Sequence, residues 1–144
     1  MNKVIMGVDV GTMWGAAISN EEYIEGKSTG AYDFYCKMLE FVDLYKPQVI
    51  VTAYPTAGYN IISSLSRKIG ALEVVCGKRG IQLEKTNDSH AQKVVLGHKR
   101  KPTKKRTQEE WDEVKDRYGV GSEHVGDALM FRECYLIEKE LTAK

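Results

Sequence analysis

The residues most able to do chemistry lie near the two ends of the chain. Asp9 ends an apolar run, where a carboxylate loses solvation unless it is paired, protonated or bound to a metal. Near the other end, SEHVGDALMF spaces Glu123, His124 and Asp127 so that one helix brings them onto neighbouring faces. Carboxylates and an imidazole together suit a divalent cation such as Mg²⁺ or Mn²⁺. Two simpler roles stay open: Asp9 as a turn residue, and Glu123 as a charge at a helix N-terminus.

Strands and helices must bring these residues together, and the sequence predicts both. We expect strands at residues 3–9, 13–19, 22–28, 47–53 and 81–86. We expect helices at residues 31–45 and 59–78, a third beginning at the capping box Thr107-Gln-Glu-Glu110, and a last one opening near Ser122. The order β-β-β-α-β-α-β-α-α predicts an α/β fold with a mixed five-stranded sheet, three strands antiparallel and then two parallel, flanked by helices.

Composition narrows the class of protein. The chain has 144 residues, which suits a single domain spanning residues 1–144, and 42% of them are apolar. No apolar run reaches the ~20 residues of a membrane span, and the first residues lack a signal-peptide pattern. The three cysteines, Cys36, Cys76 and Cys134, are widely spaced and without a CxxC motif, which disfavours a disulfide framework. We therefore expect a cytoplasmic protein.

The net charge of +1 conceals a strong segregation. Residues 85–106 hold eight Lys or Arg and one acid, a net charge of +7, whereas the rest of the chain sums to −6. Within this stretch, GHKRKPTKKR contains Gly97 and Pro102, which predict an exposed loop. A solvated loop is the simpler interpretation, but this density of cations favours contact with phosphate groups.

The whole pattern resembles the RuvC family of Holliday junction resolvases, within the RNase H-like superfamily. The resemblance rests on G-x-D-x-G-T at Asp9, on VIVTAYPT, on the long helix and basic segment, and on EHVGDALMF. It spans nearly the whole chain and is closest to the short phage-encoded members. It implies a homodimer that nicks four-way DNA junctions with two divalent metals, in the cytosol of a bacterium or of a phage-infected host.

The resemblance also assigns roles to individual residues. Asp9 would bridge both ions, with His124 and Asp127 completing the metal site, and Lys104 or Lys105 would contact the scissile phosphate. The DNA-binding residues would include the cations of the basic segment and two tyrosines that can stack on unpaired bases: Lys93, Lys99, Arg100, Lys101, Lys104, Lys105, Arg106, Tyr54 and Tyr59. For the tyrosines, half-buried loop anchors are the alternative.

One position departs from the family. Ala53 stands where the family carries a Glu at the end of a strand. Either another residue replaces that carboxylate, or the chain is an inactivated variant, or it binds junctions without cutting them. Asp88 is the first candidate replacement, although it is equally well explained as the N-cap of a helix at residues 89–96, and Glu123 is a second.

Three smaller expectations complete the analysis. Trp14 and Trp111 are interpreted as packing residues. The apolar arc of the helix at residues 59–78 is the expected dimer interface. The D-x-G-T motif also occurs in actin-like ATPases and sugar kinases, but those folds bind a nucleotide between two domains, and 144 residues accommodate one.

Overall fold

A computed structural model of the chain describes residues 3–11, 13–27, 30–53, 59–97 and 108–143, with the side chains of residues 59–64 and 140–143 excluded. Its strands are β1 (Ile5–Asp9), β2 (Met13–Ala17), β3 (Tyr23–Lys27), β4 (Val49–Ala53) and β5 (Gln82–Thr86). Its helices are α1 (Ala31–Tyr45), α2 (Tyr59–Arg79), α3 (Asp88–Leu96), α4 (Gln108–Tyr118) and α5 (Glu123–Ala143).

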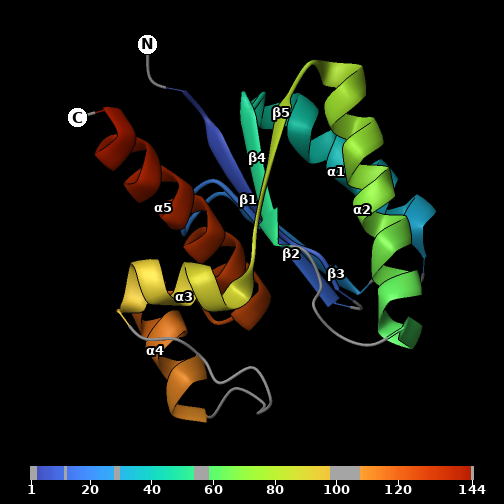
Figure 1. The fold of residues 1–144 in the computed structure, drawn as a ribbon. Helices are drawn as coiled ribbons and strands as arrows, with labels where there is room; N and C mark the ends of the chain where they lie inside the picture. The colour runs from blue at the N-terminus through green and yellow to red at the C-terminus, as the bar shows by residue number, and fades with distance from the viewer. Residues whose placement is uncertain (1–2, 12, 28–29, 54–58, 98–107, 144) are drawn as a thin grey trace.

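The five strands form one mixed sheet in the order β3-β2-β1-β4-β5. The first three strands are an antiparallel meander, and β4 and β5 run parallel to β1. Helices α1 and α2 lie on one side of this sheet and α5 on the other, with α3 and α4 next to α5 (Figure 1). The expected α/β class and the expected arrangement of the strands are confirmed.

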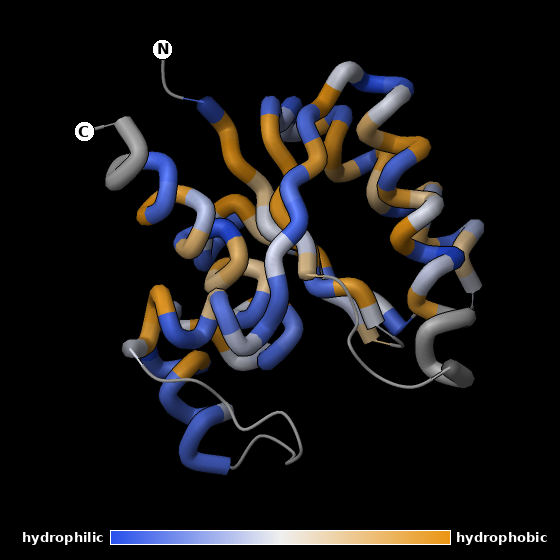
Figure 2. The backbone as a smooth tube through the Cα atoms, viewed as in Figure 1, coloured by the Kyte–Doolittle hydropathy of each residue, from blue (hydrophilic) through white to orange (hydrophobic). Residues whose placement is uncertain are grey.

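Alternation along the strands creates a core on each face of the sheet. Met6 and Val8 of β1 pack with α1 and α2, whereas Ile5 packs with α5. Figure 2 shows hydrophobic residues recurring along the strands and along α2, whereas α4 is largely hydrophilic. Because side chains alternate along a strand, Asp9 lies on the same side of β1 as Ile5 and faces α5.

The element boundaries match the expectations closely. The expected order has two helices after the last strand and the structure has three, because the helix that was considered at residues 89–96 forms as well. That helix, α3, ends at Gly97, whose φ of 86° is left-handed and costs glycine little strain. Gly80 ends α2 in the same way, with a φ of 64°. Thr107 of the expected capping box lies outside the described residues.

Most of the apolar arc of α2, within its described side chains, is buried in the core of the same chain. Ile69, Leu72 and Val75 are buried, and the last two belong to the core with α1. Val74, 49% exposed, lies on the outer surface of the helix. The expected dimer interface on α2 therefore has less apolar surface available than the sequence suggested. Among the described residues, no helix is long and apolar enough to cross a membrane.

Candidate active site at the end of strand β1

Asp9 and His124 meet where β1 ends and α5 begins. The Oδ2 atom of Asp9 lies 3.1 Å from Nδ1 of His124, and each side chain is about a fifth exposed, at 21% and 22%. The other ring nitrogen of His124, Nε2, is 3.6 Å from Oε1 of Glu123. The imidazole therefore lies between two carboxylates at a partly open rim.

Two glycines allow α5 to approach the hairpin closely enough for this contact. A Cβ atom on Gly7 would lie 1.7 Å from the carbonyl oxygen of Ala128. A Cβ atom on Gly15 would lie 2.8 Å from the backbone carbonyl of His124. Because backbone atoms on both sides would clash with any side chain, the first two turns of α5 can lie against β1 and β2 only when these positions carry none.

Asp127 faces the body of the protein, as its position before an apolar run predicted. It is 6% exposed, and its charge acts on His124 together with those of Asp9 and Glu123. The hydrogen bond that Asp9 accepts from the ring raises the pKa of His124 above its ordinary value, although burial opposes this, and the charges of the three nearby carboxylates add to the rise. The rim thus carries a negative potential that favours a cation.

This donor set fits a divalent metal ion. Three carboxylates supply the hard oxygen ligands that Mg²⁺ and Mn²⁺ prefer, and an imidazole is compatible with Mn²⁺. The raised pKa of His124 indicates that positive charge is stabilised at this place. Asp9, Glu123, His124 and Asp127, all expected as metal ligands, are brought to one rim.

The register of the sheet brings Ala53 to the same rim. Val8 of β1 pairs with Thr52 of β4, so continuing the ladder by one residue sets Asp9 beside Ala53. Val49 and Val51 belong to the core on the α5 side, and Ala53 packs against the same core. A carboxylate at position 53 would therefore lie next to Asp9, whereas the alanine there supplies no metal ligand.

Asp88 does not have the capping role that was its alternative explanation. The N-cap of α3 is Asn87, whose backbone is extended and whose side chain accepts a hydrogen bond from the backbone N–H of His90 at 2.8 Å. Asp88 is already helical and lies in the first turn of α3, partly buried. The N-cap interpretation is wrong because the residue before Asp88 reaches the same backbone donors.

Lys68 is a residue near the site that the sequence analysis missed. It comes from α2, is 4% exposed, and its Nζ donates a hydrogen bond to the carbonyl oxygen of Gly11 at 2.7 Å. Gly11 lies two residues after Asp9, so this ammonium holds the turn that follows β1. A signal was present, because Lys68 interrupts the apolar arc formed by Leu65, Ile69 and Leu72.

A pocket of about 310 Å³ opens beside Glu123 and His124. Two further charged residues line it: Glu25 of β3 and Lys115 of α4. Glu25 pairs with Gly15, which pairs with Asp9, so all three share the side of the sheet that faces α5. The sequence analysis missed both residues, because only the strand register and the packing of α4 show their positions.

The packing of α4 fixes where Lys115 lies. Arg117 donates two hydrogen bonds to Glu133 of α5, through Nε at 3.1 Å and Nη2 at 2.5 Å. Tyr118 also donates to Glu133, and Val114 is buried in the core with α5. Lys115 lies between these anchors, where it pairs with Asp112 at 3.8 Å. This lysine is a described cation on the wall of the same pocket as His124.

Most of the expected DNA-binding residues lie outside the described part of the chain. They are Lys99, Arg100, Lys101, Lys104, Lys105, Arg106 and Tyr54, and the side chain of Tyr59 is likewise excluded. Lys93 is exposed on α3. Their roles stay predictions.

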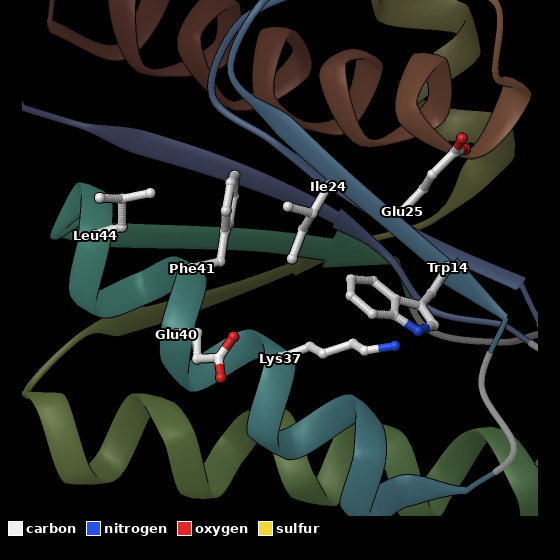
Figure 3. Close-up of a pocket in the computed structure, with 7 residues that line it drawn as sticks. All are labelled: Trp14, Ile24, Glu25, Lys37, Glu40, Phe41 and Leu44. Atoms are coloured by element: carbon white, nitrogen blue, oxygen red, sulfur yellow. The ribbon is translucent and has the colours of Figure 1, made fainter.

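A second pocket, of about 340 Å³, lies on the opposite face of the sheet, between β3 and α1. Trp14, Ile24 and Phe41 line it, and Glu25 points away from it toward the side of α5 (Figure 3). Trp14 has no exposed surface and stacks edge-on against Phe34, with ring centroids 5.1 Å apart. The expected packing role of Trp14 is confirmed, and this apolar pocket is separate from the acidic rim.

Comparison with solved structures identifies the fold. The structure of RuvC from T. thermophilus in complex with a Holliday junction substrate matches with a TM-score of 0.76 at 15% identity, covering 98% of this chain and 97% of that one. Another Thermus thermophilus RuvC structure matches with a TM-score of 0.73 at 15% identity, covering 96% of each chain. No protein-family profile and no curated protein sequence matches. The chain has the RuvC-type, RNase H-like fold that the sequence predicted.

Proposed function

We propose that this chain is a metal-dependent endonuclease that resolves four-way or other branched DNA, acting as a homodimer with residues 1–144 as its nuclease domain. The observation that carries the proposal is the 3.1 Å contact between Asp9 and His124, surrounded by further acids, within a fold shared with RuvC. A buried Asp127 beside this contact supports a site built for a cation rather than a surface ion pair.

The four residues at the rim would have different roles in binding metal. Asp9, Asp127 and Glu123 would hold divalent ions through their carboxylates, and His124 would supply a nitrogen ligand once it has lost its proton. When bound, such ions activate a water molecule and stabilise the leaving oxygen of a phosphodiester. Asp9 also orients the His124 ring through Nδ1, so the opposite ring nitrogen faces Glu123.

Lysine and arginine side chains of the chain would bind the phosphate groups of the DNA. Lys115 lines the pocket beside His124 and would exchange its ion pair with Asp112 for a phosphate group near the metal site. The part of the basic stretch that follows α3, residues 98–106, would add the strong positive charge that binding to branched DNA requires, with Lys104 or Lys105 at the scissile phosphate. A homodimer would have two active sites related by a two-fold axis, and each would make one of a pair of nicks in the junction.

A cleavage assay tests the proposal. The purified chain is incubated with a labelled four-way junction, and with linear duplex of the same sequence, in Mg²⁺ and in Mn²⁺. We expect paired nicks in the four-way junction and no nicks in the linear duplex. Asp9→Asn should abolish nicking while junction binding persists, and the matched variant Asp33→Asn, on the opposite side of the sheet, should nick normally. Nicking by Asp9→Asn would contradict the metal assignment.

Ala53 supports a second candidate, a protein that binds junctions without cutting them. The sheet register puts this alanine beside Asp9, so the rim has one carboxylate fewer than the family pattern. Tight junction binding with no nicking in either metal would favour this candidate. Light scattering tests the homodimer in both cases, because a monomer at micromolar concentration would contradict paired cleavage by a preformed dimer.

A further inference from the structure

A second group of metal-ligand side chains lies away from the acidic rim. His90 of α3 and Cys134 and Glu138 of α5 each offer one ligand atom, and these atoms all lie within 4.8 Å of one another. Within the described ranges, no other set of three His, Cys, Asp or Glu side chains is gathered this closely. Cys134 is seven residues after Asp127, which corresponds to about 10 Å along the helix axis. The group is therefore separate from the rim at Asp9.

Secondary structure directs the three side chains toward one point. Cys134 and Glu138 are four residues apart on α5, so they lie one above the other on the same face. His90 lies in the first turn of α3, where Asn87 accepts a hydrogen bond from its backbone N–H. His90 Nε2 contacts Glu138 Oε1, and the Sγ of Cys134 is 3.6 Å from that same oxygen. Imidazole, thiol and carboxylate thus converge.

The surroundings suit a cation with one buried ligand and with two ligands that are in contact with solvent. Cys134 is 2% exposed, whereas the side chains of His90 and Glu138 are each 48% exposed. Glu84 of β5 lines the same pocket, of about 250 Å³, and adds another carboxylate. Lys85 also lines this pocket, and its ammonium pairs with Glu73 of α2 at 3.7 Å.

We propose that His90, Cys134 and Glu138 bind a zinc ion, with water or Glu84 as the fourth ligand. Zinc accepts nitrogen, sulfur and oxygen ligands at about 2.0–2.3 Å in tetrahedral geometry, which sets its ligand atoms roughly 3.3–3.8 Å apart. The 3.6 Å separation of sulfur and oxygen already falls in this range. A thiol and an imidazole select against Mg²⁺. The two sites therefore differ in the metal they prefer.

A zinc ion here would join α3 to α5. Burial raises the pKa of the Cys134 thiol to about 11, and Glu138 adds to the rise, so an incoming metal must displace a proton from sulfur. The ion would link the two helices through metal–ligand bonds to His90 of α3 and to Cys134 and Glu138 of α5, in place of the direct contact between His90 and Glu138. Because α3 ends at Gly97, directly before the basic segment, the metal would fix the point from which that segment starts.

Titration with Co²⁺ tests the proposal, because a cobalt–thiolate bond gives a charge-transfer absorption that carboxylate and imidazole ligands do not. We expect this band in the full chain and in Asp9→Asn, which alters only the rim. The matched control Cys36→Ser, on α1, should keep the band, and Cys134→Ser should lose it. Absence of the band in the full chain, or its persistence in Cys134→Ser, would overturn the proposal.

Calorimetric titration with Zn²⁺ supplies a second readout that does not depend on replacing a buried residue. His90→Ala and Glu138→Gln change half-exposed side chains and should leave the fold intact. Each should weaken Zn²⁺ binding at least about tenfold, because each removes one ligand. Unchanged affinity in both variants would show that His90 and Glu138 form an ion pair only.

Discussion

The Oδ2 atom of Asp9 lies 3.1 Å from Nδ1 of His124, although 115 residues separate them in sequence. The contact joins the last residue of β1 to the first turn of α5, and it exists because Gly7 and Gly15 let the helix lie against the hairpin. Glu123 and Asp127, the other ligands that we assign to the rim site, act on the same His124 ring. The electrostatics and packing of this contact therefore give the most direct tests of the site.

The titration of His124 is the first prediction. In metal-free protein we expect its pKa to lie above the ordinary value of about 6.5, because Asp9 accepts a hydrogen bond from the ring and nearby acids favour the cation. NMR titration of the His124 ring measures it directly. Asp9→Asn should lower the pKa. Mg²⁺ should lower it too, because a cation at the rim repels the proton; an unchanged value with saturating Mg²⁺ would argue against an ion beside His124.

The same shift has a consequence for stability. A raised folded-state pKa means that protonated His124 stabilises the metal-free fold below its unfolded-state pKa. That contribution disappears as the pH rises through the folded-state value. Asp9→Asn should therefore lose more stability at pH 5 than at pH 9, as measured by urea unfolding.

The close packing at Gly15 gives the second prediction. Gly15→Ala would force a Cβ atom to within 2.8 Å of the His124 backbone, so α5 must shift away from the hairpin. We expect the free energy of unfolding to fall by about 1–3 kcal/mol and the pKa of His124 to fall toward its ordinary value. Gly70→Ala is the matched control. It adds the same methyl group on α2, where no atom lies within 4 Å, and should stabilise the chain slightly.

Local sequence patterns predicted the parts of the fold that depend on periodicity and turn residues. The strands, the boundaries of α1 and the acidic residues at the start of α5 follow from alternation, from helical spacing and from a carboxylate at the end of an apolar run. The partners of those residues depend on register and packing. Glu25 reaches the α5 side only because β3 pairs with β2 in one register, and Lys115 lines the same pocket as His124 only because Glu133 holds α4. No local pattern contains that information.

Lys68 gives the third prediction. Burial lowers the pKa of its ammonium, so keeping this charge inside costs free energy that the hydrogen bond to Gly11 offsets. Lys68→Met keeps the aliphatic volume and removes the donor. We expect global stability to change by less than about 2 kcal/mol, whereas the amides of residues 9–17 should exchange hydrogen faster. Arg67→Met, at the exposed neighbouring position, is the control, and equal exchange in both variants would show that Lys68 does not hold the turn.

The fourth prediction concerns Ala53. Ala53 lies beside Asp9 in the β1–β4 ladder and on the side of the sheet that faces α5. Metal affinity at oxygen sites rises with the number of charged ligands, because each carboxylate adds attraction for a divalent ion. An acid at this position should therefore strengthen metal binding at the rim without altering the rest of the site.

Ala53→Glu should raise the affinity for Mg²⁺ at least about tenfold in calorimetric titration, since the new carboxylate adjoins Asp9. Ala53→Gln is the matched control: it has the same size without the charge, and its affinity should stay near that of the unaltered chain. Adding Asp9→Asn to Ala53→Glu should remove the gain, because the two carboxylates must act on the same ion. If the Glu and Gln variants bind Mg²⁺ equally, position 53 is not part of the metal site.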